Sequence, residues 1–258
     1  MNEKNKKTIK KIGASAVIFI AYVCLFVIFW AVAYKIIAND YLFPSFGQTM
    51  KEIGRLLVSR VFYNAFWATF LRAMRVFFIA LLSGAVLAII TYLLPLFFKI
   101  LAPIITLLRA LPTMAIIVMI KIWTSPVDAP VVVAFLGLFP MLYTGVYNTL
   151  ASISPKLVEM CKLYKVPLYK RIFLMYLPLS SPALLRESGA GLSFSLKLVV
   201  SAEVMVSTFI SLGNMINEAG MYAMIPKAFA LTILVVALGL VLELTALILA
   251  SVIERRVR

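Results

Sequence analysis

Histidine is missing from this chain of 258 residues, and cysteines and acidic residues are scarce. Without histidine, the chain lacks the commonest general base and metal ligand. The two cysteines, Cys24 and Cys161, stand on different sequence elements at no metal-ligand spacing, so we expect neither a disulfide framework nor a zinc site. With only 10 Asp and Glu in the whole chain, we predict no catalytic residue, no metal and no cofactor.

Charge of either sign is also low for a chain of this length. Charged residues make up 14% of it and hydrophobic residues 64%, whereas soluble domains carry about 25% charged residues. The mean hydropathy is +1.05. A chain this apolar cannot cover itself with polar surface, so lipid must be its solvent. Because apolar blocks run almost end to end, we predict a single transmembrane domain over residues 1–258.

About six apolar blocks have the roughly 20 residues that a membrane-spanning helix needs. They cover about 13–37, 64–93, 97–122, 129–150, 183–207 and 228–252. The first block is longer than the apolar region of a signal peptide, so we interpret it as a retained span. Pro103 and Pro112 lie inside the third block, which we expect to be kinked rather than straight. Simple kinks are the plainest interpretation of these prolines and of Pro140, and gating hinges are the alternative.

The positions of the basic residues predict the orientation. The formal net charge is +15, and Lys and Arg gather before the first block, within residues 151–180 and at the C-terminus. Because basic residues in short loops mark the cytoplasmic side, both termini and residues 151–180 are predicted to be cytoplasmic. Nucleic acid is not an expected partner, since binding it requires a basic face on a soluble fold.

Residues 151–180 are too polar for hydrocarbon and follow a helical pattern. Their apolar residues recur at helical spacing on both sides of residues 165–167, which predicts two short amphipathic helices hinged there. Pro167 suits the first turn of the second helix. A further amphipathic helix is predicted within residues 38–63, along the outer face. The fold class is therefore an all-α membrane protein of about six transmembrane helices with a cytoplasmic two-helix loop.

The same interval carries a motif with fixed spacing. Glu159 is followed six residues later by Lys165, and nine further residues precede Met175-Tyr176-Leu177-Pro178. This resembles the coupling loop of ABC importer permeases, whose pattern is Glu-Ala-Ala, three residues, Gly, nine residues, Ile, any residue, Leu-Pro. Three positions match, namely Glu159, Leu177 and Pro178. The departures are Met160 and Cys161 for the two alanines, Lys165 for the glycine and Met175 for the isoleucine.

The resemblance implies a mechanical role for this loop, in which a short helix docks into a groove on a soluble ATPase and moves with it. The implied ATPase-coupling residues are Glu159, Lys162, Lys165, Leu177 and Pro178. Glycine permits a tight turn between the two helices, and Lys165 either avoids the left-handed conformation there or tolerates it at about 1–2 kcal/mol. The carboxylate of Glu159 would cap or orient the coupling helix, whereas the orientation rule alone explains the basic residues.

The resemblance extends from about residue 40 to the C-terminus. Over this length the chain is similar to the nitrate/sulfonate/taurine group of these permeases. The segments that carry it are Phe43-Pro44-Ser45, residues 69–76, Leu108-Arg109-Ala110-Leu111-Pro112, Phe139-Pro140, Asn148-Thr149, Ala202-Glu203 and Leu212-Gly213. The group's Trp-Phe-Gly-Ile-Gly region after the third span is not recognisable in residues 122–126.

Ionisable residues inside the spans are candidates for the translocation path. Such residues are costly in lipid and face a partner or water. The path candidates are Arg109, Pro112, Lys197 and Glu203; structural pairs between helices or headgroup contacts are the alternative for these charges and for Glu187 and Glu243. For Glu187, beside Arg186, the structural interpretation is favoured. Arg72 and Arg75 begin the second span and can snorkel to the interface.

The resemblance implies the permease subunit of a bacterial ABC importer, a subunit that is not an enzyme. It implies a homodimer in the inner membrane, two cytoplasmic ATP-binding subunits and an extracytoplasmic substrate-binding protein; a heterodimer is the alternative to the homodimer. The solute would be a sulfonate, taurine, nitrate or a vitamin precursor. The chain itself has no Gly-x-x-x-x-Gly-Lys-Ser/Thr loop. The alternatives are an ion-coupled secondary transporter, which would not need the amphipathic loop, and a membrane-embedded enzyme, which would need clustered acids or histidines.

Overall fold

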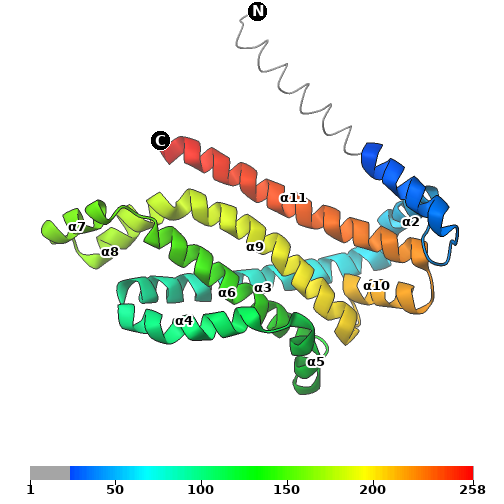
Figure 1. Cartoon of the computed structure of the whole chain (residues 1–258), viewed down its shortest axis with the longest axis horizontal. Helices are drawn as coiled ribbons and strands as arrows, with labels where there is room; N and C mark the ends of the chain where they lie inside the picture. The colour runs from blue at the N-terminus through cyan, green and yellow to red at the C-terminus, as the bar shows by residue number, and fades with distance from the viewer. Residues whose placement is uncertain (1–23, 258) are drawn as a thin grey trace, which may run out of the picture.

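The computed structural model of the chain describes residues 24–257, and every regular element in that range is helical (Figure 1). An apolar helix at Cys24–Ile37 comes first. The elements that follow are α2 (Phe46–Val58), α3 (Arg60–Leu93), α4 (Pro95–Ala110), α5 (Thr113–Trp123), α6 (Ala129–Ala151), α7 (Pro155–Leu163), α8 (Leu168–Arg171), a π-helical turn (Ile172–Tyr176), α9 (Leu177–Val206), α10 (Leu212–Met221) and α11 (Ile225–Val257).

The core lies where α3, α6 and α9 pack together, and α11 packs along α9. Aliphatic side chains such as Val76, Leu138 and Leu196 are fully buried there. Small residues allow the close approach of helices that is usual in membranes. A Cβ at Gly84, for example, would lie 3.1 Å from the backbone nitrogen of Tyr143 on α6. Apolar pattern and small residues together therefore determine which faces meet.

Four described helices are long and apolar enough to cross a membrane. They are Arg60–Leu93, Ala129–Ala151, Glu187–Val206 and Ile225–Val252. The pair α4 and α5 passes the same test together but is bent by 95°, so the count is five if this pair forms one span. These helices overlap five of the six predicted spans. Of the predicted span at 13–37, residues 24–37 form the apolar helix Cys24–Ile37, and residues 13–23 lie outside the described residues. Six spans therefore remain a prediction.

The third predicted span is broken, which is a stronger departure from a straight helix than the kink expected from its prolines. Pro103 lies inside α4 without ending it, whereas Leu111 and Pro112 are extended, with ψ of 128° and 118°. The residue before a proline is disfavoured in the helical region, so α4 ends at Ala110, before Leu111, and Pro112 precedes α5. Pro140 lies within the continuous α6.

The predicted helix within residues 38–63 is α2, which packs on α11. Ser45 caps it by accepting a hydrogen bond from the Gln48 backbone N–H, and the Gln48 side chain accepts one from the Ser45 N–H. This reciprocal capping box satisfies two backbone donors at the start of the helix. The indole of Trp30 donates to the Pro44 carbonyl at 3.1 Å and so ties the preceding helix to this end of the fold.

The predicted two-helix interval corresponds to α7 and α8, at the opposite end of the bundle from α10 (Figure 1). The break between the two helices falls at residues 164–167, and Pro167 precedes α8 as its cap. After α8, the π-helical turn leads without interruption into α9. Leu177 and Pro178, expected at the end of a separate loop, therefore begin the helix that contains the fifth apolar segment.

Candidate functional site

Residues 155–171, called here the α7–α8 loop, expose several apolar side chains. Leu163 is 80% exposed and Tyr164 75%. The other large exposed hydrophobic side chains of the loop are Leu157, Met160, Leu168 and Tyr169. They alternate with exposed lysines. Because this segment is too charged for lipid, apolar side chains left uncovered here indicate a surface that binds another protein.

A tight turn at Lys165 separates the two helices of the loop. Lys165 has φ 47°, so it occupies the left-handed region. Its backbone N–H donates to the Lys162 carbonyl at 3.0 Å, and that of Val166 donates to Cys161 at 2.9 Å. These are the two bonds of a Schellman motif, whose left-handed position is usually glycine. Of the two alternatives for Lys165, the structure thus has the tolerated left-handed conformation, and the turn keeps the form that a glycine would give it.

The other predicted coupling residues lie on or beside this loop. Glu159 and Lys162 are exposed on α7 and line a hollow of about 220 Å³ between α7 and Tyr92, near the end of α3. Glu159 is the fifth residue of α7, beyond its first turn, so its carboxylate does not cap this helix. Glu159 forms no ion pair within the described part of the chain, which leaves it available to a partner.

Glu203, a predicted path residue, lies in a buried polar network instead of a cavity. Its side chain is 0% exposed, it forms an ion pair with Arg72, and its Oε2 accepts hydrogen bonds from Thr69 Oγ1 at 2.9 Å and the Gly213 N–H at 3.2 Å. The Leu212 N–H donates to Thr69 Oγ1 at 2.9 Å. The network ties α3, α9 and α10 together, which favours the structural interpretation of Glu203. The snorkelling expected of Arg72 is wrong, because its guanidinium turns inward to this carboxylate.

Gly213 is required by the same network. A Cβ at this position would lie 2.4 Å from Glu203 Cβ and 2.7 Å from the Val200 carbonyl oxygen. The first turn of α10 can therefore approach α9 only without a side chain here. Backbone N–H groups at a helix start carry partial positive charge, and two of them stabilise this buried carboxylate directly or through Thr69.

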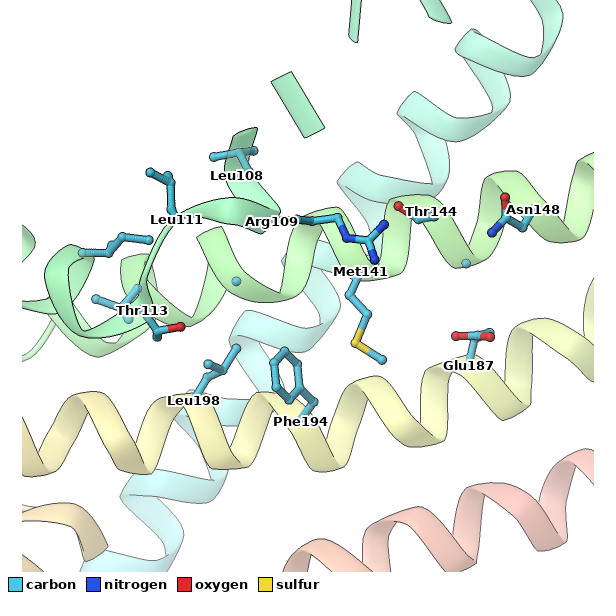
Figure 2. A pocket seen from close by; sticks show the side chains of 14 residues that line it. Leu108, Arg109, Leu111, Thr113, Met141, Thr144, Asn148, Glu187, Phe194 and Leu198 are labelled. Atoms are coloured by element: carbon cyan, nitrogen blue, oxygen red, sulfur yellow. The ribbon is translucent and has the colours of Figure 1, made fainter. Parts of the chain in front are cut away.

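A cavity of about 390 Å³ lies between the α4–α5 break, α6 and α9 (Figure 2). Arg109, Leu111 and Thr113 line it at the break. The remaining lining includes Met141, Thr144 and Asn148 of α6 and Glu187, Phe194 and Leu198 of α9. Figure 2 shows the side chains of Arg109 and Glu187 directed into this space from opposite sides. The break in the third apolar segment is therefore what opens a polar space in the bundle.

The structure separates the four predicted path residues. Arg109 lines the cavity, and Pro112 lies at the break between two lining residues. Lys197 is exposed on α9 but does not line the cavity, and Glu203 is buried elsewhere. Sequence reasoning missed Glu187 as a lining residue. The signal for Glu187 was a carboxylate inside an apolar segment, for which a structural pair or a headgroup contact was the favoured interpretation.

The chain is similar to known transport proteins in both sequence and fold. Residues 80–258 match the model of a family described as "Binding-protein-dependent transport system inner membrane component". Two inward-facing structures of the MetNI methionine ABC transporter resemble the fold. The first, a CY5 SeMet soak crystal form, has a TM-score of 0.68 and 15% identity, and the match covers 75% of this chain and 96% of that chain.

The second structure, the CY5 native crystal form, has a TM-score of 0.65 and 16% identity over 73% of this chain and 94% of that one. At these identities the likeness is one of fold. A search of the curated proteins found no match.

Proposed function

The chain belongs to the family of binding-protein-dependent transport system inner membrane components, and we propose that two copies of it form the path of an importer driven by a cytoplasmic ATPase. Members of this family are the permease subunits of ABC importers, which are not catalytic, because a partner subunit hydrolyses ATP. The protein is accordingly a multi-pass component of the inner membrane, with several apolar helices.

The observation that carries the proposal is the uncovered apolar surface of the α7–α8 loop. A loop of this charge lies outside hydrocarbon, yet Leu163 and Tyr164 are the most exposed of its large hydrophobic residues. The Schellman bonds at Lys165 hold the two helices in one arrangement, so force applied to α7 passes through α8 and the π-helical turn into α9. The loop can thus transmit a movement of the ATPase to the membrane helices.

The dimer is inferred from one face of α9. Phe194, Lys197, Ser201 and Met205 are exposed on the isolated chain, and their spacing of three or four residues puts them on one side of the helix. An ammonium group in a membrane-spanning helix is costly in lipid and usually faces water or a partner. We infer that this face lines the central path against a second copy of the chain.

The orientation and the solute are parts of the same proposal. The basic termini and the basic α7–α8 loop support a cytoplasmic location for all three. An extracytoplasmic binding protein would deliver the solute, which we place in the sulfonate, taurine, nitrate or vitamin-precursor class. Arg109 in the cavity supports a solute with an anionic group, since guanidinium binds such groups well.

Two single substitutions of exposed side chains test the docking role. Leu163→Asp places a charge on the α7–α8 loop, and Phe209→Asp places one beyond the opposite end of α9, at a residue that is 84% exposed. Neither residue is packed, so both variants should fold. When the ATP-binding subunit of the importer is co-expressed, we expect it to co-purify with Phe209→Asp in detergent and to be lost with Leu163→Asp.

Glu159→Lys, in the same assay, tests whether the carboxylate orients the loop at the ATPase. Equal recovery of the ATP-binding subunit with Leu163→Asp and Phe209→Asp would contradict the docking surface. Active transport by the purified chain alone would instead establish the ion-coupled transporter.

A further inference from the structure

Two side chains of opposite charge share the cavity at the α4–α5 break without reaching each other. Arg109 is in the last turn of α4, and Glu187 is on α9. Both line the cavity, and Figure 2 shows their side chains entering it from different helices. Within the described residues, neither forms an ion pair. Glu203, by contrast, has Arg72 as its counter-ion.

Arg109 and Glu187 are both exposed on the isolated chain. Charged groups in apolar helices of a membrane protein usually pair or face a water-filled path. A ligand site would explain a cavity that holds a positive and a negative side chain apart. A ligand that carries an anionic and a cationic group can meet both charges at once, whereas a simple anion would leave Glu187 without a counter-ion and would approach a carboxylate. The arrangement therefore discriminates by charge pattern and not by net charge alone.

The size and the walls of the cavity suit such a ligand. Its volume of about 390 Å³ falls in the range of about 300–1,000 Å³ found for small-molecule sites. Gly145 makes room for the acid, because a Cβ there would lie 3.1 Å from Glu187 Oε2. Asn148, exposed one turn further along α6, adds an amide that can donate or accept. Phe194 and Leu198 form an apolar wall for the carbon skeleton.

The two ends of the cavity differ in polarity. The break places the start of α5 in the wall of the cavity, where Thr113 lines it. Backbone N–H groups at the start of a helix lack partners within that helix, and half-helices in transporters direct such starts at the anionic groups of their solutes. A sulfonate or carboxylate would thus lie at Arg109, with the ammonium group of the same molecule at Glu187.

From this geometry we propose that the cavity binds a ligand carrying an anionic group and an ammonium group, such as an aminosulfonate or an amino acid. The proposal rests on the proposed function and narrows its solute class. The headgroup of phosphatidylethanolamine has the same two charges, so the test must separate a soluble ligand from a lipid.

Matched ligand pairs that differ only in the ammonium group provide the test. The permease, bound to its ATP-binding subunit in phosphatidylglycerol nanodiscs, is titrated with taurine and with isethionate, which has a hydroxyl in place of the ammonium. L-Alanine and L-lactate form a second pair. We expect at least one amino compound to bind about tenfold or more tightly than its partner, since each charge-assisted contact is strong.

Variants assign each charge to its contact. Glu187→Gln should abolish the preference for the amino compound while leaving binding of the anion, and Arg109→Gln should weaken both members of a pair. Arg75→Gln, at an exposed cation of α3 that does not line the cavity, should change neither affinity. A loss of preference confined to Glu187→Gln cannot arise from a general defect in folding.

The outcomes separate this inference from the function on which it rests. The inference is overturned if neither ligand pair shows a preference for the amino compound, or if Glu187→Gln keeps that preference. The permease assignment stands in both cases, provided that the ATP-binding subunit remains bound. If the ATP-binding subunit never associates, the proposed function itself fails. A third outcome would assign the site to a lipid headgroup. In that case phosphatidylethanolamine co-purifies with the unmodified chain and is lost in both cavity variants, and no soluble amino compound binds.

Discussion

Arg72 and Glu203 are 131 residues apart in the chain and meet inside it as an ion pair. Three elements meet at this carboxylate, because Thr69 and the start of α10 also donate to it. A buried ion pair is weak evidence of net stabilisation, since both charges lose hydration. Its partners are nevertheless interdependent, because removing one leaves the other buried without compensation.

Replacement of Arg72 should therefore be among the most destabilising substitutions of an ionisable residue. We expect Arg72→Met to lower the free energy of unfolding by about 3–5 kcal/mol, because the Glu203 carboxylate is left without its counter-ion. Arg72→Met combined with Glu203→Gln should recover part of this loss. The measurement is the denaturation midpoint in detergent, followed by circular dichroism.

Arg75→Met provides the control on the same helix, because Arg75 is exposed. A surface substitution of this kind changes stability by no more than about 0.5 kcal/mol. Equal losses of unfolding free energy for Arg72→Met and Arg75→Met would mean that the buried ion pair does not make Arg72 more important for stability than an exposed arginine.

At the scale of elements, the connection between α7 and α8 is where a local rule is broken. Lysine has a Cβ, and the left-handed conformation costs such a residue about 1–2 kcal/mol. The two Schellman bonds hold Lys165 there all the same, and Pro167, the extended cap before α8, follows the turn. Because Lys165 is exposed, its side chain remains available to a partner that a glycine could not contact.

Two substitutions of Lys165 should have opposite effects on this turn. Lys165→Gly removes the steric cost of about 1–2 kcal/mol, so hydrogen exchange of the α7 amides should slow or stay unchanged. Lys165→Val adds a β-branched side chain that the left-handed region disfavours, so exchange should quicken and recovery of the ATP-binding subunit should fall. Faster exchange in the glycine variant than in the valine variant would contradict the turn.

For the whole molecule, the α7–α8 loop and α10 mark opposite ends of one helical bundle (Figure 1). The turn between α5 and α6, at residues 124–128, follows α5, and Figure 1 shows α5 far from the α7–α8 loop. If the loop is cytoplasmic, this turn is predicted to face outside. The proposed orientation therefore places two exposed sites on opposite sides of the membrane.

Cysteine labelling in whole cells tests this orientation. In a chain with Cys24 and Cys161 replaced by alanine, Val127→Cys should react with a membrane-impermeant maleimide, and Ser154→Cys should react only after permeabilisation. Both positions are exposed in the fold, so access differs only through the membrane. Labelling of Ser154→Cys in intact cells, with Val127→Cys protected, would reverse the topology.

Much of the architecture follows from the sequence, because it rests on local patterns. Apolar length predicts where helices cross the membrane, and the helices Arg60–Leu93 and Ile225–Val252 cover two of the predicted spans. The steric restriction before Pro112 acts between neighbouring residues, as does the spacing that predicts α7 and α8. These features needed no knowledge of which helices are neighbours.

Only the tertiary structure decided which charges meet. From the sequence, Glu187 and Glu203 are both carboxylates in one apolar segment; Arg186 beside Glu187 favoured a structural role for Glu187, and the resemblance at Ala202-Glu203 favoured a path role for Glu203. Packing places Glu203 against Arg72 and the start of α10, and places Glu187 in a cavity with Arg109. The reason is that an ion pair or a cavity depends on how separate helices are rotated and brought together, whereas helix-forming periodicity depends on near neighbours alone.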